Sequence, residues 1–388
     1  MRAVLTNFGS RGDVQPYLAL GVEMQRHGHN PVIATSPEYR SEVERCGLEF
    51  CQLGPDLTEA LRSTIMGEIK AAEIDHSAEL MQPFLLLVKS ALPETFDQLK
   101  RICQDADLLI SGPEQAIAQL VREALGIPLA LVQLGHFDLP VWPDVQRECA
   151  QFLNAFRAQI GLPESSDYMV RDPQIELYAM SRHVVSRPSD WPSNRHLTGY
   201  FFLDGDQWQP DPALSSFIDS GEPPVVICFS SMIHEDPDAL TNLLIEGLKL
   251  AGYRAIIQQG WSGVGRSTLP ANIYVTGSVP HSWLFRRAAC VVHHGGAGTA
   301  ASAFRAGVPS VFIPHYSDQP LWAMHFYETG YCVPPIPLTH LSAERLAMAL
   351  AATLSYPPYR EKAIELGRKI DAERGVENAR QLIEQNFQ

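Results

Sequence analysis

The feature that most constrains the fold is a recurring alternation of short apolar runs and helical spacings. At the N-terminus, an apolar run over Arg2–Phe8 is followed by a glycine turn, a helical spacing over Val14–His27 and a second apolar run over Asn30–Thr35. Strands joined through a helix in this way are parallel, with a right-handed crossover. The sequence therefore predicts a parallel α/β sheet at this end of the chain.

The alternation recurs in both halves of the chain. The first half also contains expected strands at Asp107–Ser111 and Ile127–Gln133 around an expected helix at Glu114–Leu125. A stretch rich in Pro, Gly and Asp then separates the halves, as a linker would. The strands expected in the second half are Val225–Phe229, Arg254–Gln258, Asn272–Thr276, Cys290–His293 and Pro309–Ile313.

We therefore expect an N-terminal domain at 1–205, a linker at 206–223 and a C-terminal domain at 224–370. A C-terminal helix at 371–388 is expected to pack back on the N-terminal domain. The fold class is α/β, with two facing, Rossmann-like, doubly wound parallel-sheet domains and a cleft between them. Such sheets bind ligands at the carboxyl ends of their strands.

Composition and charge exclude several classes of protein. The 388 residues suffice for two domains, and no apolar run approaches the roughly 18–20 residues of a membrane span. The N-terminal apolar run is too short for a signal peptide, so we expect a cytoplasmic protein, with peripheral membrane contact left open. The formal net charge of −14 disfavours nucleic acid as a partner. Seven cysteines without a Cys-x-x-Cys pair indicate free thiols.

One glycine-rich loop has the composition of an anion site. The loop His294–Thr299 follows an expected strand and opens an expected helix. Its small residues allow a ligand to approach the backbone, and the helix N-terminus offers free N–H groups with a partial positive charge. It has neither the P-loop nor the dinucleotide-binding pattern of glycines. A bound diphosphate and a ligand-free strand-to-helix turn both explain it.

The segments around this loop carry a family resemblance. They are Val279–Phe285, Val292–Thr299, Gly307–Val311 and Pro314–Gln319, together with Gly9–Pro16 near the N-terminus. In order and spacing they resemble the inverting glycosyltransferases of the UDP-glycosyltransferase superfamily, which have the GT-B fold. Sterol 3-β-glucosyltransferases and bacterial glycosyltransferases of antibiotic biosynthesis are the most similar groups. The resemblance is weak between about 40 and 220.

The resemblance implies a role for each matching residue. Asp318 and Gln319 would bind the donor sugar, Val279 and His281 would flank the nucleobase, and Asp13 would be the general base. The residues expected at the donor diphosphate are Ser231, His294, Gly295, Gly296, Ala297, Gly298 and Thr299. The implied reaction transfers a hexose, with glucose as the family expectation, from a UDP- or dTDP-sugar. The nucleotide sugar is a co-substrate, and no cofactor is expected.

The acceptor is expected to be a lipophilic molecule with a hydroxyl group, such as a sterol, lipid or polyketide. Two insertions, at about 56–104 and 136–175, interrupt the alternation, and insertions at the carboxyl ends of strands build ligand pockets. The acceptor-binding candidates in them are Phe84, His136, Phe137 and Trp142. Core packing and local turns explain these four residues equally well.

Each functional assignment has a simpler alternative. Asp13 could cap the helix that follows it, and Asp318 with Gln319 could form a surface turn. His293 and His294 are adjacent on a strand and point to opposite faces, which disfavours a shared metal ion. The Asp-x-Asp pairs at 105–107, 204–206 and 236–238 fit turns and helix caps, so no metal is expected.

Two rival functions keep the same fold. One is a nucleotide-sugar 2-epimerase, which would need several acidic residues around the sugar and no acceptor pocket. The other is a non-catalytic nucleotide-sugar binding protein, for which Asp13 and Asp318 would have no purpose.

Overall fold

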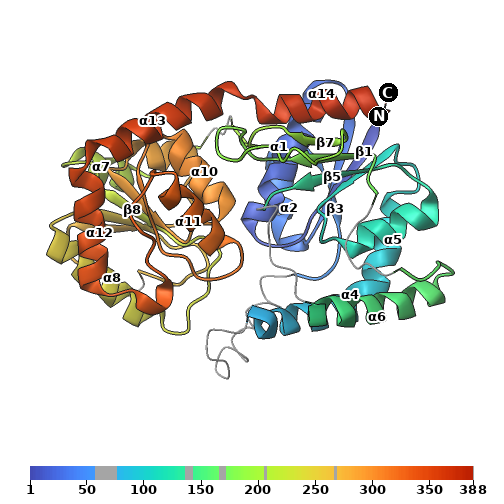
Figure 1. The fold of residues 1–388 in the computed structure, drawn as a ribbon, viewed down its shortest axis with the longest axis horizontal. Helices are drawn as coiled ribbons and strands as arrows, with labels where there is room; N and C mark the ends of the chain where they lie inside the picture. The colour runs from blue at the N-terminus through green and yellow to red at the C-terminus, as the bar shows by residue number, and fades with distance from the viewer. Residues whose placement is uncertain (57–76, 136–142, 166–171, 205–207, 266–268, 388) are drawn as a thin grey trace. The chain divides into compact units, whose positions relative to one another are not determined.

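The computed structural model describes residues 1–56, 77–135, 143–165, 172–204, 208–265 and 269–387. The chain forms two compact units. Unit 1 comprises Met1–Leu134, Asp138–Leu203 and Glu373–Gln388, and unit 2 comprises Gly135–Phe137 and Asp204–Ala372. Each unit contains one parallel sheet, as the sequence predicts, and Figure 1 shows the elements of both.

Unit 1 is built on a seven-stranded sheet with the order β3-β2-β1-β4-β5-β6-β7. Its strands are β1 (Arg2–Thr6), β2 (Asn30–Thr35), β3 (Glu49–Gln52), β4 (Leu108–Ser111), β5 (Leu129–Gln133), β6 (Ile175–Tyr178) and β7 (Arg195–Leu197). Every pairing among them is parallel. The alternation of side chains puts Ala3 and Leu5 in one core layer and Val4 in the other, so both faces of the sheet are covered.

Helices cover the two faces of this sheet. They are α1 (Arg11–Arg26), α2 (Arg40–Arg45), α4 (Ser77–Ile102), α5 (Ala116–Leu125), α6 (Pro143–Gln159) and α14 (Gly375–Phe387), with a short 3₁₀ turn, η1 (Pro37–Tyr39). The core layer of Leu5 contains residues of α1 and α14, and the core layer of Val4 contains residues of α4 and α5. No helix among the described residues is long and apolar enough to cross a membrane.

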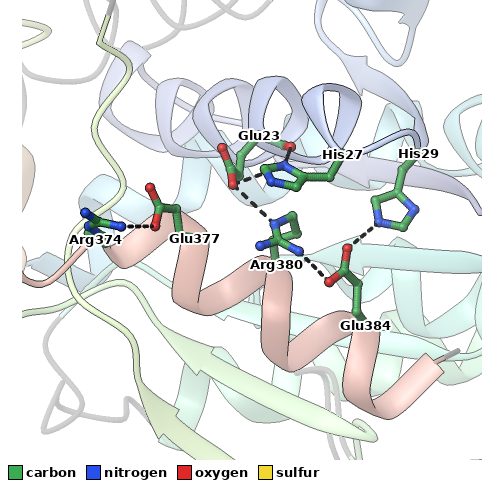
Figure 2. Close-up of polar contacts among 7 residues, drawn as sticks. All are labelled: Glu23, His27, His29, Arg374, Glu377, Arg380 and Glu384. Carbon is green, nitrogen blue, oxygen red and sulfur yellow. Dashed lines mark hydrogen bonds and ion pairs between the residues drawn. The ribbon is translucent and has the colours of Figure 1, made fainter.

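A buried ion-pair network joins α14 to α1 (Figure 2). Arg380 lies between two carboxylates: its Nε is 3.2 Å from Oε1 of Glu23, and its guanidinium also binds Glu384. The Nε2 of His29 lies 2.8 Å from the same Glu384. Arg380 and Glu23 are both buried, so each charge depends on the other for its solvation.

Replacing Arg380 by methionine should lower the free energy of unfolding by about 3 kcal/mol, because Glu23 would be left buried without its main counter-charge. Urea denaturation of the variant measures this loss. Arg374→Met is the matched control, because the pair of Arg374 with Glu377 is exposed and should contribute less than about 1 kcal/mol. Equal losses in the two variants would contradict the assignment.

Unit 2 is built on a five-stranded parallel sheet with the order β10-β9-β8-β11-β12. Its strands are β8 (Val225–Cys228), β9 (Ala255–Gln258), β10 (Ile273–Thr276), β11 (Cys290–His293) and β12 (Ser310–Phe312). Its helices are α7 (Pro212–Asp219), α8 (Pro237–Ala251), α9 (His281–Leu284), α10 (Ala297–Arg305), α11 (Gln319–Glu328), α12 (Ala343–Ser355) and α13 (Pro357–Ala372), with 3₁₀ turns η3 (Phe285–Arg287) and η4 (Leu338–His340).

The structure corrects the linker expected at 206–223. Helix α7 occupies residues 212–219, and its Leu214 is buried in the core of unit 2. Asp211 caps this helix by accepting the N–H of Ala213, and Pro212 takes the first helical position. Pro and Asp mark helix starts as well as irregular turns, so composition alone misled the prediction.

Candidate functional site

The donor-site candidates of unit 2 lie on loops that leave neighbouring strands. Strands β8, β11 and β12 are adjacent and parallel, so the loops that follow them leave the same edge of the sheet. These loops carry Ser231, the glycine-rich segment and Asp318 with Gln319. The fold thus brings the residues expected at the diphosphate and the sugar to one edge of one sheet.

The glycine-rich loop forms a tight turn at the start of α10. Gly296 is the N-cap, and Gly295 has a φ of +94°, a conformation that favours glycine. The ring of His293 fixes the turn, since its Nδ1 accepts the N–H of Gly295 at 3.1 Å. The first N–H groups of α10 have no partner within the helix and can bind an anion.

His294 lies directly over this helix N-terminus. A Cβ atom added to Gly296 would lie 2.5 Å from the Nε2 of His294, so a side chain there would push the ring away from the turn. His294 is 6% exposed, and burial lowers its pKa to about 4. The imidazole is therefore neutral at pH 7 and can act as a hydrogen-bond donor without carrying a charge.

His293 has a different role from His294. It is completely buried, and burial lowers its pKa well below the usual value. The two ring centroids are 6.5 Å apart and nearly perpendicular. His293 is thus a structural residue that holds the loop, and this histidine pair is not arranged to share a metal ion.

The loop after β8 contains backbone strain. Ser230 has a φ of +50°, a left-handed conformation in which glycine is favoured. Its carbonyl accepts the N–H of Trp261 at 2.8 Å, and a Cβ added to Gly260 would lie 2.1 Å from that oxygen. These contacts fix the backbone next to Ser231, the serine expected at the diphosphate.

Replacing Ser230 by glycine should stabilise unit 2 by about 0.5–1 kcal/mol. The left-handed conformation costs serine about 1–2 kcal/mol, and the greater freedom of glycine in the unfolded chain cancels about 0.4–1 kcal/mol of the gain. Thermal or urea denaturation measures the change. The control is Ser231→Gly, because Ser231 has no positive φ and its replacement should give no gain. A less stable Ser230→Gly protein would show that the serine hydroxyl outweighs the strain.

The loop after β12 is more than a surface turn. Gln319 is buried, and its Oε1 accepts the N–H of His315 at 2.9 Å and that of Tyr316 at 3.3 Å. The carboxylate of Asp318 is half-buried and accepts the indole N–H of Trp322 at 3.0 Å. Gln319 therefore braces the turn, and Asp318 has one carboxylate oxygen oriented by the indole.

Two further histidines lie at this edge, and the sequence interpretation missed them. His234 and His315 have ring centroids 5.0 Å apart, and the ring of His315 is 6.5 Å from that of His294. Burial lowers the pKa of His234 to about 4 and that of His315 to about 3. Phe229 packs against both rings. Each histidine follows a strand end, and that position was the signal that could have identified them.

The nucleobase candidates lie on the segment 279–285. Val279 is a buried core residue, and its carbonyl accepts Nε2–H of Gln258 at 2.8 Å. The ring of His281 stacks on Phe285 with centroids 4.3 Å apart. The segment 279–285 contributes Val279, Leu284 and Phe285 to the core of unit 2, and the assignment of Val279 and His281 to the nucleobase stays a prediction.

Asp13 lies in unit 1, in the first turn of α1, the helix that follows β1. Its Oδ2 accepts the backbone N–H of Ser10 at 2.7 Å and the hydroxyl of Ser10 at 2.9 Å, and Asn7 donates to its carbonyl at 3.0 Å. Ser10 is the N-cap of α1, and Asp13 is the acidic member of a capping box. The helix begins at Arg11, before the expected Val14, so Asp13 caps it from the first turn.

Two family models match this chain, one in each half. Residues 3–135 match the family model "Glycosyltransferase family 28 N-terminal domain", and residues 255–384 match "Erythromycin biosynthesis protein CIII-like, C-terminal domain". The O-mycaminosyltylonolide 6-deoxyallosyltransferase of Streptomyces fradiae is 32% identical over 99% of this chain and 97% of its own length. The chain belongs to the GT-B glycosyltransferases.

Other similar proteins extend this relationship. Sterol 3-beta-glucosyltransferase UGT80B1 of Arabidopsis thaliana is 32% identical over 95% of this chain, and the chain spans 65% of that protein's length. The crystal structure of the Streptomyces glycosyltransferase SsfS6, complexed with thymidine diphosphate, has a TM-score of 0.72 at 21% identity, covering 99% of each chain. This glycosyltransferase thus shares its fold with SsfS6.

Some expected site residues of the glycosyltransferase remain outside these observations. His136, Phe137 and Trp142 lie outside the described residues, and Phe84 lies on α4 without a described side chain. Three aspartates of the Asp-x-Asp pairs have structural roles: Asp105 pairs with Arg2, Asp204 pairs with Arg305, and Asp236 caps α8. In the part of the chain that the structure describes, no group of three or more His, Cys, Asp or Glu residues could hold a metal ion.

Proposed function

We propose that this glycosyltransferase moves a hexose, with glucose as the first candidate, from a UDP- or dTDP-sugar to a hydroxyl of a lipophilic small molecule. Transfer inverts the anomeric configuration and uses neither a metal ion nor another cofactor. The observation that carries the proposal is the glycine-rich turn at the N-terminus of α10 with a neutral, buried histidine over it.

The donor diphosphate binds the N–H groups of residues 296–299, the ring of His294 and the hydroxyl of Ser231. A helix N-terminus stabilises the negative charge that develops on a leaving diphosphate, which is the role a metal ion plays in other transferases. The thymidine diphosphate bound by a structural neighbour supports a nucleoside diphosphate as the ligand.

The donor sugar binds the loop after β12. The Asp318 carboxylate accepts hydrogen bonds from sugar hydroxyls, and the indole of Trp322 holds it in place. The amide nitrogen of Gln319 lies 3.4 Å from the sulfur of Met232, a weak acceptor, so it can donate to a better one. The ring of His281 contacts the nucleobase.

Asp13 removes the proton from the acceptor hydroxyl as the hydroxyl oxygen attacks the anomeric carbon. The C1–O bond to the diphosphate breaks on the opposite face, so the configuration inverts. The two hydrogen bonds from Ser10 orient the carboxylate without neutralising it. Two relatives are named for a sterol and for O-mycaminosyltylonolide, which supports an apolar acceptor.

A panel of UDP- and dTDP-sugars, assayed for nucleotide release with sterol and polyketide acceptors, tests the proposal. Acceptors presented in lipid vesicles and in detergent would show whether membrane contact matters. We expect acceptor-dependent release that persists in EDTA and a product of inverted configuration. Epimerised donor in the absence of acceptor would favour the 2-epimerase, and nucleotide binding without turnover would favour the binding protein.

A further inference from the structure

Helix α10 has a second charged contact at the end opposite the glycine-rich loop. Arg305 lies in its last turn, and the Nη1 and Nη2 of Arg305 are 2.8 and 2.6 Å from the two carboxylate oxygens of Asp204. Its Nε is 2.6 Å from Oδ1 of Asp371. One guanidinium therefore holds two carboxylates from distant parts of the sequence, in the planar geometry that arginine provides and lysine does not.

The two carboxylates mark places where the chain passes between the units. The chain enters unit 2 at Asp204, directly after Leu203 of unit 1, and leaves it after Ala372. Asp371 is the residue before Ala372. Arg305 thus binds both connecting segments, 203–204 and 371–374, from within unit 2.

Helix α10 is also in close contact with α13, the helix that ends at the second connecting segment. A Cβ added to Gly367 on α13 would lie 2.5 Å from the carbonyl oxygen of Phe304 and 3.0 Å from that of Arg305. The backbones of the two helices therefore meet without side chains between them. A shift of α10 along this contact would carry α13 with it.

In unit 1 the continuations of the two segments are joined to each other. The amide nitrogen of Asn378 donates to the carbonyl of Thr198 at 2.9 Å and to that of Glu373 at 2.6 Å. A Cβ added to Gly375 would lie 2.4 Å from the carbonyl oxygen of Tyr200. Between these fixed points lies Arg374, whose φ of +50° is unfavourable for a residue other than glycine.

We propose that Arg305 is a positioning residue for the transfer reaction. It links the helix that binds the diphosphate to both segments that connect the units, so that donor binding at one end of α10 and the conformation of the connecting segments are coupled. The proposal rests on the proposed function, because it needs a nucleoside diphosphate at the N-terminus of α10. For binding the coupling is reciprocal, so the connecting segments change donor affinity only by the factor by which the donor shifts them, whereas the effect on kcat is not limited to that factor.

Hydrogen–deuterium exchange with and without UDP tests the coupling directly, with dTDP as the second probe. In the wild-type protein, UDP should protect amides at 295–300 and also at 198–204 and 371–378. In Arg305→Gln, protection at 295–300 should persist and protection at the connecting segments should be lost. We expect the kcat of this variant to fall about 10-fold, because a small misplacement of bound substrates slows the chemical step, while the weak coupling to binding changes the Kd for UDP less than about 3-fold.

Matched variants separate coupling from simple stability. Arg360 lies on α13, and Arg360→Gln also removes a guanidinium from this helix. The hydrogen bonds described for Arg360 go to the carbonyls of Ala288 and Ala289 and not to the connecting segments. Arg360→Gln should leave the protection pattern unchanged. Asp204→Asn combined with Asp371→Asn should reproduce the Arg305→Gln pattern, and Arg305→Lys should recover part of the wild-type kcat, because lysine can pair with one carboxylate.

If UDP protects 198–204 and 371–378 in Arg305→Gln as much as in the wild-type protein, the coupling is wrong and the proposed function is unaffected. A loss of UDP affinity equal to the loss of kcat would also overturn it, since Arg305 would then act on the donor site alone. Absence of UDP and dTDP binding by the wild-type protein would overturn the proposed function, and this proposal with it.

Discussion

Replacement of Asp13 by asparagine should lower kcat by about 10²–10⁴-fold, the usual contribution of a general base. An amide cannot take the proton of the acceptor hydroxyl, but its oxygen can still accept the hydrogen bonds from Ser10 that cap α1. The substitution therefore separates catalysis from capping. Nucleotide release with a working acceptor measures kcat, and calorimetry with UDP measures donor binding, which should stay within about 3-fold because Asp13 is proposed to act on the acceptor hydroxyl and not on the nucleotide.

A control is needed because Asp13 supports the fold of its own loop. Gly9 has a φ of +132°, and a Cβ there would lie 2.4 Å from Oδ2 of Asp13, so the carboxylate is packed against the turn. Ser10→Ala removes one of the two capping donors and should lower stability by about 1 kcal/mol. If Asp13→Asn unfolds no more readily than Ser10→Ala and still turns over at the wild-type rate, Asp13 is only a cap.

The sheets could be predicted because their signal is local. Strands in the middle of each sheet are buried on both faces and so appear as short apolar runs, as Val225–Cys228 and Cys290–His293 show. The partly exposed strands β3 and β7 lack this signal and were not predicted. Helix α7 was missed because the same Pro and Asp residues favour a loop and a helix start. A packing partner decides between them, and in unit 2 that partner is the core around Leu214.

The candidate site could be predicted only where one residue type has one plausible use. Glycines at 295 and 296 indicated a close backbone approach; Gly295 has the positive φ that favours glycine, and Gly296 lies against the ring of His294. Gln319 was assigned to the sugar by position, but its carbonyl oxygen is used within its own turn. Burial of His234 and His315 depends on contacts between loops far apart in sequence, and no local pattern reports such contacts.

Residues with an unfavourable backbone conformation lie beside several of the expected donor residues. The described residues other than glycine with positive φ are Asp172, Ser230, Ser317 and Arg374. Ser230 directly precedes Ser231, and Ser317 directly precedes Asp318, so two of the four set the backbone beside expected donor ligands. Arg374 lies in a connecting segment. Such conformations persist where the surroundings hold them and are frequent at functional sites.

Replacement of His294 by alanine should weaken UDP binding about 10–100-fold while changing the affinity for uridine less than about 2-fold, since a hydrogen bond to a charged group contributes about 1.5–3 kcal/mol. The reason is the position of the ring over Gly296, where the proposed function places the diphosphate and not the base. Titration calorimetry with both ligands measures the difference. His294→Asn is the matched variant, because its amide can still donate, and it should recover part of the UDP affinity. Equal losses for UDP and uridine would make His294 structural.

The pH dependence of UDP binding identifies the form of the histidine that acts. Burial lowers the pKa of His294 to about 4, so in the free protein the ring is neutral above about pH 5. A neutral donor gives an affinity that is nearly constant between pH 7 and pH 9 in wild-type protein, in the range where the diphosphate is fully ionised. A bound anion favours the protonated ring of His294. The contribution of His294 to UDP affinity should therefore rise only as the pH falls toward the pKa of this histidine. A tenfold loss of affinity per unit between pH 7 and pH 9, abolished in His294→Ala, would instead require an imidazolium at neutral pH and would contradict this assignment.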